Sequence, residues 1–169
     1  MDQTALLRRN AVEEIMKKRL ELLKRQHKRR EYEKRVAFEK ERLISEHINF
    51  TKYYRFADQS EADRINSVLN GLPVRCSRPD FSRLLIEHRS QSIDDLLQYE
   101  NEDIWICCLC GSIELINLFS LGKMSSFIHD FEYWYDISDY LFLLFHNFID
   151  FIYIDDNGEI VKSKVVINE

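Results

Sequence analysis

The sequence is poor in the two residues that most often end helices and form tight turns. It has 4 Gly and 2 Pro in 169 residues, and neither type occurs before Gly71. Such scarcity indicates long, unbroken elements with few tight turns. The four Cys are also too few and too clustered for the disulfide framework of a secreted protein, because three of them lie within residues 107–110 and cannot join distant segments.

Signal peptides and long apolar runs are missing as well. Residues 1–14 contain no apolar stretch of the kind that secretory signals carry. The longest apolar run, 140–154, is interrupted by His146, Asn147 and Asp150 and is too short and too polar to cross a bilayer. We therefore expect a soluble intracellular protein with no membrane partner. It would be cytoplasmic, or inside a host cell if viral, since the frequent use of Ile, Asn, Phe and Tyr suits an AT-rich or viral genome.

Positive charge is concentrated at one end of the chain. Residues 1–57 contain 16 Lys or Arg against 9 Asp or Glu, and residues 58–169 contain 8 against 20, so a part with net charge +7 precedes a part with net charge −12. The length leaves room for one ordinary domain and an appendage. The asymmetry predicts a long basic helical arm over 1–57, a short helix and joint over 58–73, and an acidic, aromatic-rich body over 74–169.

The basic end is predicted to be one long helix, from about residue 4 to residue 57. Nothing in this stretch breaks a helix, and four Glu-to-basic pairs have the favourable i,i+4 spacing: Glu13–Lys17, Glu14–Lys18, Glu21–Arg25 and Glu31–Arg35. Adjacent apolar pairs recur every seven residues, but Arg29 and Arg30 replace the pair expected between 22/23 and 36/37. This narrow, interrupted stripe suits a helix that docks on a partner better than a self-sufficient coiled coil, although it leaves a dimer through residues 15–50 open.

The greatest excess of basic charge lies within residues 17–35, which hold ten Lys or Arg against three Glu. The candidate contact residues of this stretch are Lys24, Arg25, Lys28, Arg29 and Arg30. Three interpretations are open. The residues form a solvated face balanced by neighbouring Glu and counterions, they contact an acidic protein surface in this chain or in a partner, or they contact phosphates as basic-region DNA binders do.

The C-terminal part is predicted to be α+β and mainly helical, with a small helical body that ends in a β-hairpin. Short amphipathic helices are expected over 60–71, with Ser60 as N-cap, over 78–90, and over 92–100. Residues 104–110 have no polar side chain, which fits a buried strand or a buried helix equally well. The hairpin is expected over 150–167, with Asn-Gly at 157–158 forming a type I′ turn.

Two further stretches bear on the shape of this body. The residues from Cys107 to Gly122 resemble the helix–turn–helix of an ankyrin repeat, with Gly111 as the turn glycine and residues 113–119 as the second helix. Because no second copy follows at the repeat period, the resemblance implies only a helix–turn–helix shape. Residues 127–153 are dense in aromatic side chains with interspersed acids, which fits either a core of buried rings or an acidic groove for a basic helix.

No arrangement of residues indicates a catalytic or metal site. Cys107 and Cys110 have a C-x2-C spacing, but zinc would need two more ligands. The available candidates are Cys76, His88, His129 and His146. The neighbours Trp105, Ile106 and Leu109 are typical of a core, so we expect buried free thiols and neither a metal nor a cofactor. The sequence also lacks a Gly-rich phosphate loop and the G-x-S-x-G and H-E-x-x-H motifs, so it predicts no enzyme class and no catalytic residue.

These observations lead to two hypotheses about function. The first is a non-enzymatic adaptor or regulatory protein, whose charged helical arm and acidic body engage a protein partner. The second is a nucleic-acid-binding protein whose basic helix contacts phosphates. A body with net charge −12 repels a polyanion, which weighs against the second hypothesis.

Overall fold

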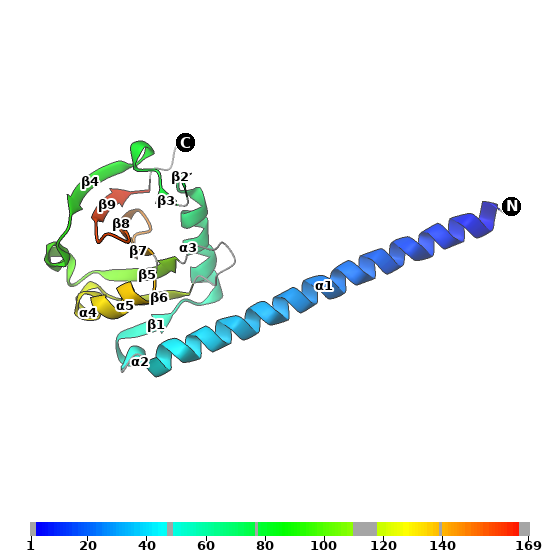
Figure 1. The fold of residues 1–169 in the computed structure, drawn as a ribbon, viewed down its shortest axis with the longest axis horizontal. Helices are drawn as coiled ribbons and strands as arrows, with labels where there is room; N and C mark the ends of the chain where they lie inside the picture. The colour runs from blue at the N-terminus through cyan, green and yellow to red at the C-terminus, as the bar shows by residue number, and fades with distance from the viewer. Residues whose placement is uncertain (1–2, 47–48, 77, 110–117, 139, 166–169) are drawn as a thin grey trace. The chain divides into compact units, whose positions relative to one another are not determined.

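The protein is described by a computed structural model that covers residues 3–46, 49–76, 78–109, 118–138 and 140–165. The chain divides into two compact units, Met1–Arg42 and Leu43–Glu169. Each unit is described by itself (Figure 1).

The first unit is part of a single long helix, α1 (Gln3–Glu46). The prediction of a long N-terminal helix is therefore correct, but the predicted end at residue 57 is wrong. Asn49 has a left-handed backbone (φ 74°), and a four-residue helix α2 (Phe50–Tyr53) and a strand β1 (Tyr54–Phe56) follow it. Burial of Tyr54 and the strand pairing of β1 outweigh the helix propensity of residues 54–56. No helix among the described residues has an apolar stretch long enough to cross a membrane.

The second unit is built around one sheet and not around helices, so the predicted small helical body is wrong. Seven strands pair antiparallel in the order β1-β6-β5-β7-β8-β9-β4, and β2 and β3 form a separate two-stranded hairpin. After β1 the elements are α3 (Gln59–Gly71), β2 (Val74–Arg75), β3 (Arg78–Pro79), η1 (Phe81–Arg83), β4 (Leu85–Ser90), η2 (Ile93–Tyr99), β5 (Asp103–Leu109), β6 (Phe119–Lys123), α4 (Met124–His129), α5 (Phe131–Asp136), β7 (Tyr140–Phe145), β8 (Asp150–Ile154) and β9 (Ile160–Lys164).

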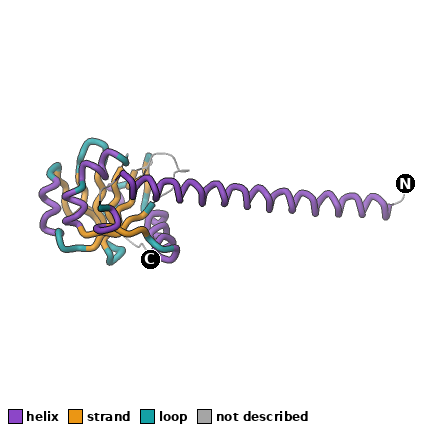
Figure 2. Tube along the Cα trace, turned by 90° about the horizontal axis from the view of Figure 1, so that it is seen from below, coloured by secondary structure: helices purple, strands orange, loops and turns teal. Residues whose placement is uncertain are grey.

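The central strands are buried on both faces, which explains why their sequences do not alternate between apolar and polar residues. Ile104 and Ile106 of β5 belong to one buried cluster, whereas Trp105 and Cys107 belong to the other. Strands β7 and β8 divide their side chains between the same two clusters. Figure 2 shows these strands in orange with helical segments in purple on both sides.

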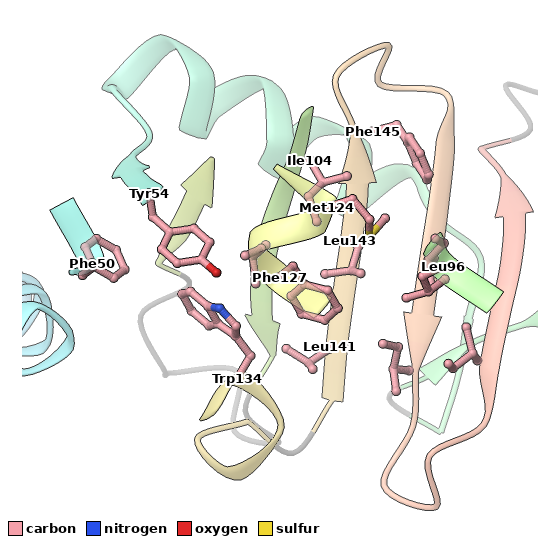
Figure 3. Packing of buried hydrophobic residues seen from close by; sticks show 14 of the residues in the cluster. Phe50, Tyr54, Leu96, Ile104, Met124, Phe127, Trp134, Leu141, Leu143 and Phe145 are labelled. Carbon is pink, nitrogen blue, oxygen red and sulfur yellow. The ribbon is translucent and has the colours of Figure 1, made fainter. Parts of the chain in front are cut away.

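Different helices cover the two faces of the sheet. Met124 and Phe127 of α4 and Trp134 of α5 pack on the face that carries Ile104, Leu141 and Leu143 (Figure 3). Ile65 of α3 packs on the opposite face, with Trp105 and Phe142. Many aromatic residues of 127–153 lie in these two clusters, which confirms the interpretation of this stretch as a core of buried rings. Those that are buried are Phe127, Trp134, Phe142, Phe145, Phe151 and Tyr153.

Two of the predicted helical segments form strands. Residues 85–90 were expected in a helix, yet they form β4, which lies at the edge of the sheet and pairs with β9. The ankyrin-like shape is also wrong where the structure describes it, because Cys107 to Leu109 belong to β5 and Phe119 to Gly122 belong to β6. The proposed turn glycine, Gly111, lies outside the described residues.

The helix and hairpin signals with clear caps or turns are largely correct. Helix α3 forms, but its N-cap is Asp58, which makes a reciprocal capping box with Glu61, and not Ser60. Ser92 caps the segment at 93–99 as expected, although that segment is a 3-10 helix. The β8–β9 hairpin is confirmed, but its turn is not type I′, because Gly158 (φ 76°) has a positive φ and Asn157 does not.

Candidate functional site

The candidate surface lies on α1, where six apolar side chains are exposed to solvent. They are Val12, Ile15, Met16, Leu20, Leu22 and Leu23, with exposed fractions from 53% to 66%. The spacings of three, four and seven residues among them place all six on one side of the helix. The first unit consists of one helix, so no second element of that unit covers these apolar side chains. The side chains are therefore available to contact another surface.

Sequence reasoning identified only part of this apolar surface. The heptad pattern found 15/16 and 22/23, but it missed Val12 and Leu20. Both follow from helical spacing, since Leu20 lies four residues after Met16 and Val12 lies four before it. A search with the period of 3.6 residues instead of 3.5 would have found them.

The basic candidate residues surround the helix and do not form one patch. Lys24 and Lys28 are four residues apart, and Arg25 is three residues before Lys28, so these three share a side of α1. Arg30 lies seven residues after Leu23 and therefore continues the line of the apolar surface. The structure thus separates Arg30 from Lys24 and Lys28, which the sequence analysis had grouped together.

Most of these basic side chains have no ionic partner among the described residues. Arg29 is the exception, because its guanidinium Nε lies 2.8 Å from Glu33 Oε1. Elsewhere on the helix, Lys18 pairs with Glu14 at 2.8 Å and Lys34 with Glu31 at 3.2 Å. These pairs are exposed, so each stabilises the helix by only about 0.3–0.5 kcal/mol. Lys24, Arg25, Lys28 and Arg30 remain able to pair with a partner.

The second unit presents mainly negative charge on the segments η2 to α5. Asp94, Asp95, Glu100, Glu102, Glu132 and Asp136 are all exposed there. Between residues 91 and 138, Lys123 is the single Lys or Arg of the sequence, and its ammonium lies 2.9 Å from the Asp103 carboxylate. This unit therefore offers an acidic surface that differs in charge from α1.

A shallow pocket of about 200 Å³ lies at the end of α4, lined by Tyr53, Ser125, Ser126, His129 and Asp130. The Tyr54 hydroxyl donates to Asp130 Oδ2 at 2.7 Å, and His129 Nδ1 lies 2.8 Å from Asp130 Oδ1. Burial of the Tyr54 ring, which packs beside Phe50 and Trp134, raises the pKa of its phenol (Figure 3). Among the described residues, no hydrogen bond joins Ser125 or Ser126 to His129.

Sequence reasoning had no means of finding the Tyr54–Asp130 contact, because the two residues are 76 positions apart. In the sequence, His129 is a candidate zinc ligand and, like Asp130, a scattered polar residue of a type that is more often structural than catalytic. Among the residues that the structure describes, no group of three His, Cys, Asp or Glu side chains is arranged so that it could hold a metal ion. Cys107 is buried in the sheet, Cys76 is exposed in the β2–β3 turn, and Cys110 lies outside the described residues.

Comparison with known proteins adds no relative to this picture. No protein-family model matches the chain, and no curated protein matches it.

Proposed function

We propose that this protein is a non-enzymatic adaptor or regulatory protein that engages a protein partner through α1. The observation that carries this proposal is the exposed apolar surface of α1 between Val12 and Leu23, followed directly by basic side chains of which, among the described residues, only Arg29 has an ionic partner. An exposed apolar stripe of this length on a helix is a common binding surface for another protein. The acidic surface of η2 to α5 would supply a second contact.

The division of charge supports a partner with negative charge opposite α1. Lys24, Arg25 and Lys28 share one side of the helix, and Arg30 extends the apolar side. Apolar contacts would supply most of the affinity, because exposed ion pairs contribute little. The basic residues would instead select the partner and speed its association.

The proposal is tested by purifying the tagged full-length protein with its partners, before and after nuclease treatment. A protein partner should remain bound after nuclease. Changing Lys28, Arg29 and Arg30 to Gln should weaken its binding about tenfold and reduce the salt dependence, since each exposed pair is worth roughly 0.2–1 kcal/mol. Lys34→Gln, which removes an internal pair with Glu31, is the matched control and should have little effect.

Nucleic acid is the alternative partner, and the exposed basic side chains of residues 24–30 are the observation that favours it. Gel shifts with the full-length protein at low and physiological salt separate the two cases. Phosphate binding would give a log–log salt slope of about −0.9 per contacted phosphate of duplex DNA. Tight binding of DNA or RNA at physiological salt that the triple substitution abolishes would overturn the protein-partner proposal.

A further inference from the structure

Residues 12–30 of α1 combine an apolar side with a strongly basic composition. This segment contains eight Lys or Arg and three Glu, in addition to the six exposed apolar side chains. As a helix it is about 28 Å long. A helix with apolar anchors at intervals of three, four and seven residues and with excess basic charge is the form recognised by acidic, apolar grooves.

Arg19 is the residue that discriminates between the occupants of this surface. It lies three or four residues from Ile15, Met16, Leu22 and Leu23, and therefore in the middle of the apolar side. At a membrane surface the apolar side would sink into the acyl region and carry Arg19 with it, at considerable cost. A protein groove that bears a carboxylate would pair with the same guanidinium.

A second copy of the chain fits this surface poorly. In a parallel pair of helices, Arg30 would face its own counterpart at the seam, seven residues after Leu23. In an antiparallel pair centred on the apolar side, Arg19 would lie opposite Met16 of the other helix and therefore within one turn of that helix's own Arg19. Like charges meet in both arrangements, whereas an acidic partner neutralises all of them.

We propose that residues 12–30 bind as a helix in a groove that is lined by methionine and other apolar side chains and rimmed by carboxylates. This is the chemistry that calcium-loaded sensors of the calmodulin kind expose. The inference rests on the proposed function, since it specifies the class of protein partner that α1 takes. The apolar side fills the groove, Arg19 in the middle of that side pairs with a carboxylate of the groove, and Arg30, which continues the apolar side, meets the acidic rim.

The test is titration of the full-length protein with calmodulin by calorimetry, in calcium and in excess chelator. We expect a one-to-one complex in calcium and none in chelator. Leu20→Gln with Leu23→Gln should weaken binding at least a hundredfold, because each buried leucine contributes on the order of a factor of ten to a hundred. Gln preserves helix propensity, and circular dichroism checks that the helix persists. Phe38→Gln, at a position 64% exposed on the same helix outside the segment, is the matched control and should bind as the parent does.

Arg19→Gln distinguishes binding in a protein groove from binding to a lipid surface, because the substitution should lower the affinity in the first case and raise it in the second. Groove binding should weaken about tenfold, while binding to vesicles of phosphatidylcholine alone, which carry no net charge that attracts Arg19, would strengthen. Absence of a calcium-dependent complex, or a complex that the Leu20 and Leu23 changes do not weaken, overturns the inference. If the purification experiment still yields a protein partner that depends on residues 28–30, the proposed function stands without it. If the purification also yields no protein partner, the inference about the groove and the proposed function are both wrong.

Discussion

Glu61 is the acidic residue whose ionisation is most clearly coupled to a specific contact. Its carboxylate accepts two hydrogen bonds from the Arg55 guanidinium, at 2.6 and 2.7 Å, and a third from the Asp58 backbone N–H at 2.9 Å. The Arg55 hydrogen bonds lower the pKa of Glu61 from 4.5 to about 2. A carboxyl whose pKa is lower in the folded state stabilises the fold above its unfolded pKa, and this contribution is lost as the pH falls through the folded value.

We therefore predict that Glu61→Gln reduces the loss of stability between about pH 5 and pH 2. The pair is partly exposed, so solvent screening limits the difference to about 1 kcal/mol. Chemical denaturation at several pH values measures it, with Asp63→Asn on the same helix as control. Equal pH dependence in the parent protein and in Glu61→Gln would show that the Arg55 pair does not persist in solution.

Among the glycines that the structure describes, Gly122 is the one at which an added side chain would have no space. A Cβ built there would lie 2.4 Å from Tyr54 Cδ1 and 2.7 Å from Tyr54 Cε1, since the two residues are opposite each other in β6 and β1. The Tyr54 ring cannot easily move away, because it is buried against Phe50 and Trp134 and its hydroxyl is bonded to Asp130.

Gly122→Ala should accordingly destabilise the second unit by about 1–3 kcal/mol, as overpacked cores commonly are. Gly71→Ala is the matched control, because nothing lies within 4 Å of its Cβ position and the residue ends a helix. That change should be neutral or slightly stabilising. Thermal melts of the two variants make the comparison, and equal stabilities would show that β1 does not pack on β6 as described.

The β8–β9 hairpin depends on the side chain that opens its turn. Asp155 is only 9% exposed, and its Oδ1 accepts hydrogen bonds from the backbone N–H groups of Asn157 at 2.9 Å and Glu159 at 2.8 Å. These bonds satisfy two amides of the turn, in which Gly158 supplies the positive φ. The turn is thus set by an aspartate and a glycine together, and not by the Asn-Gly pair alone.

Asp155→Ala should cost about 1–3 kcal/mol, because two turn amides lose their acceptor. The neighbouring Asp156 is exposed and pairs with Arg78 at 3.0 Å, so Asp156→Ala should cost less than about 1 kcal/mol. Urea denaturation of both variants gives the two values. A larger loss for Asp156 would contradict the roles that we assign to the neighbouring carboxylates.

Elements with local signals could be predicted from the sequence, and elements defined by burial could not. Helix α1, helix α3 and the β8–β9 hairpin carry their own propensity, cap or turn residues. Strand β5 is buried on both faces and so shows no alternation, while β4 at the sheet edge carries Glu87, His88 and Arg89, which read as part of a polar helix. Pairing with distant strands determines both, and a single sequence does not contain that information.

The candidate surface on α1 could likewise be predicted only in part from the sequence. Its basic residues and four of its six apolar residues are visible in the composition and spacing of the chain. The distribution of Lys24, Lys28 and Arg30 around the helix required the helical geometry, and the Tyr54–Asp130 contact required the fold. Composition indicates that a helix is basic, whereas the side of the helix on which each basic residue lies depends on three-dimensional spacing.

The division between the two units has a sharp consequence for truncation. Leu43 and Phe50 follow the first unit and are buried in the core of the second, with exposed fractions of 5% and 2%. Removal of residues 1–42 should therefore leave a second unit that melts cooperatively at nearly the same temperature. Removal of residues 1–50 also removes both core side chains, each worth about 2–5 kcal/mol, which is a large part of the 5–15 kcal/mol that stabilises a typical domain. Calorimetry of the two truncated proteins provides the test. Loss of cooperative melting in the shorter deletion would show that residues 1–42 are part of the core, and equal stability in both would show that Leu43 and Phe50 do not stabilise the sheet.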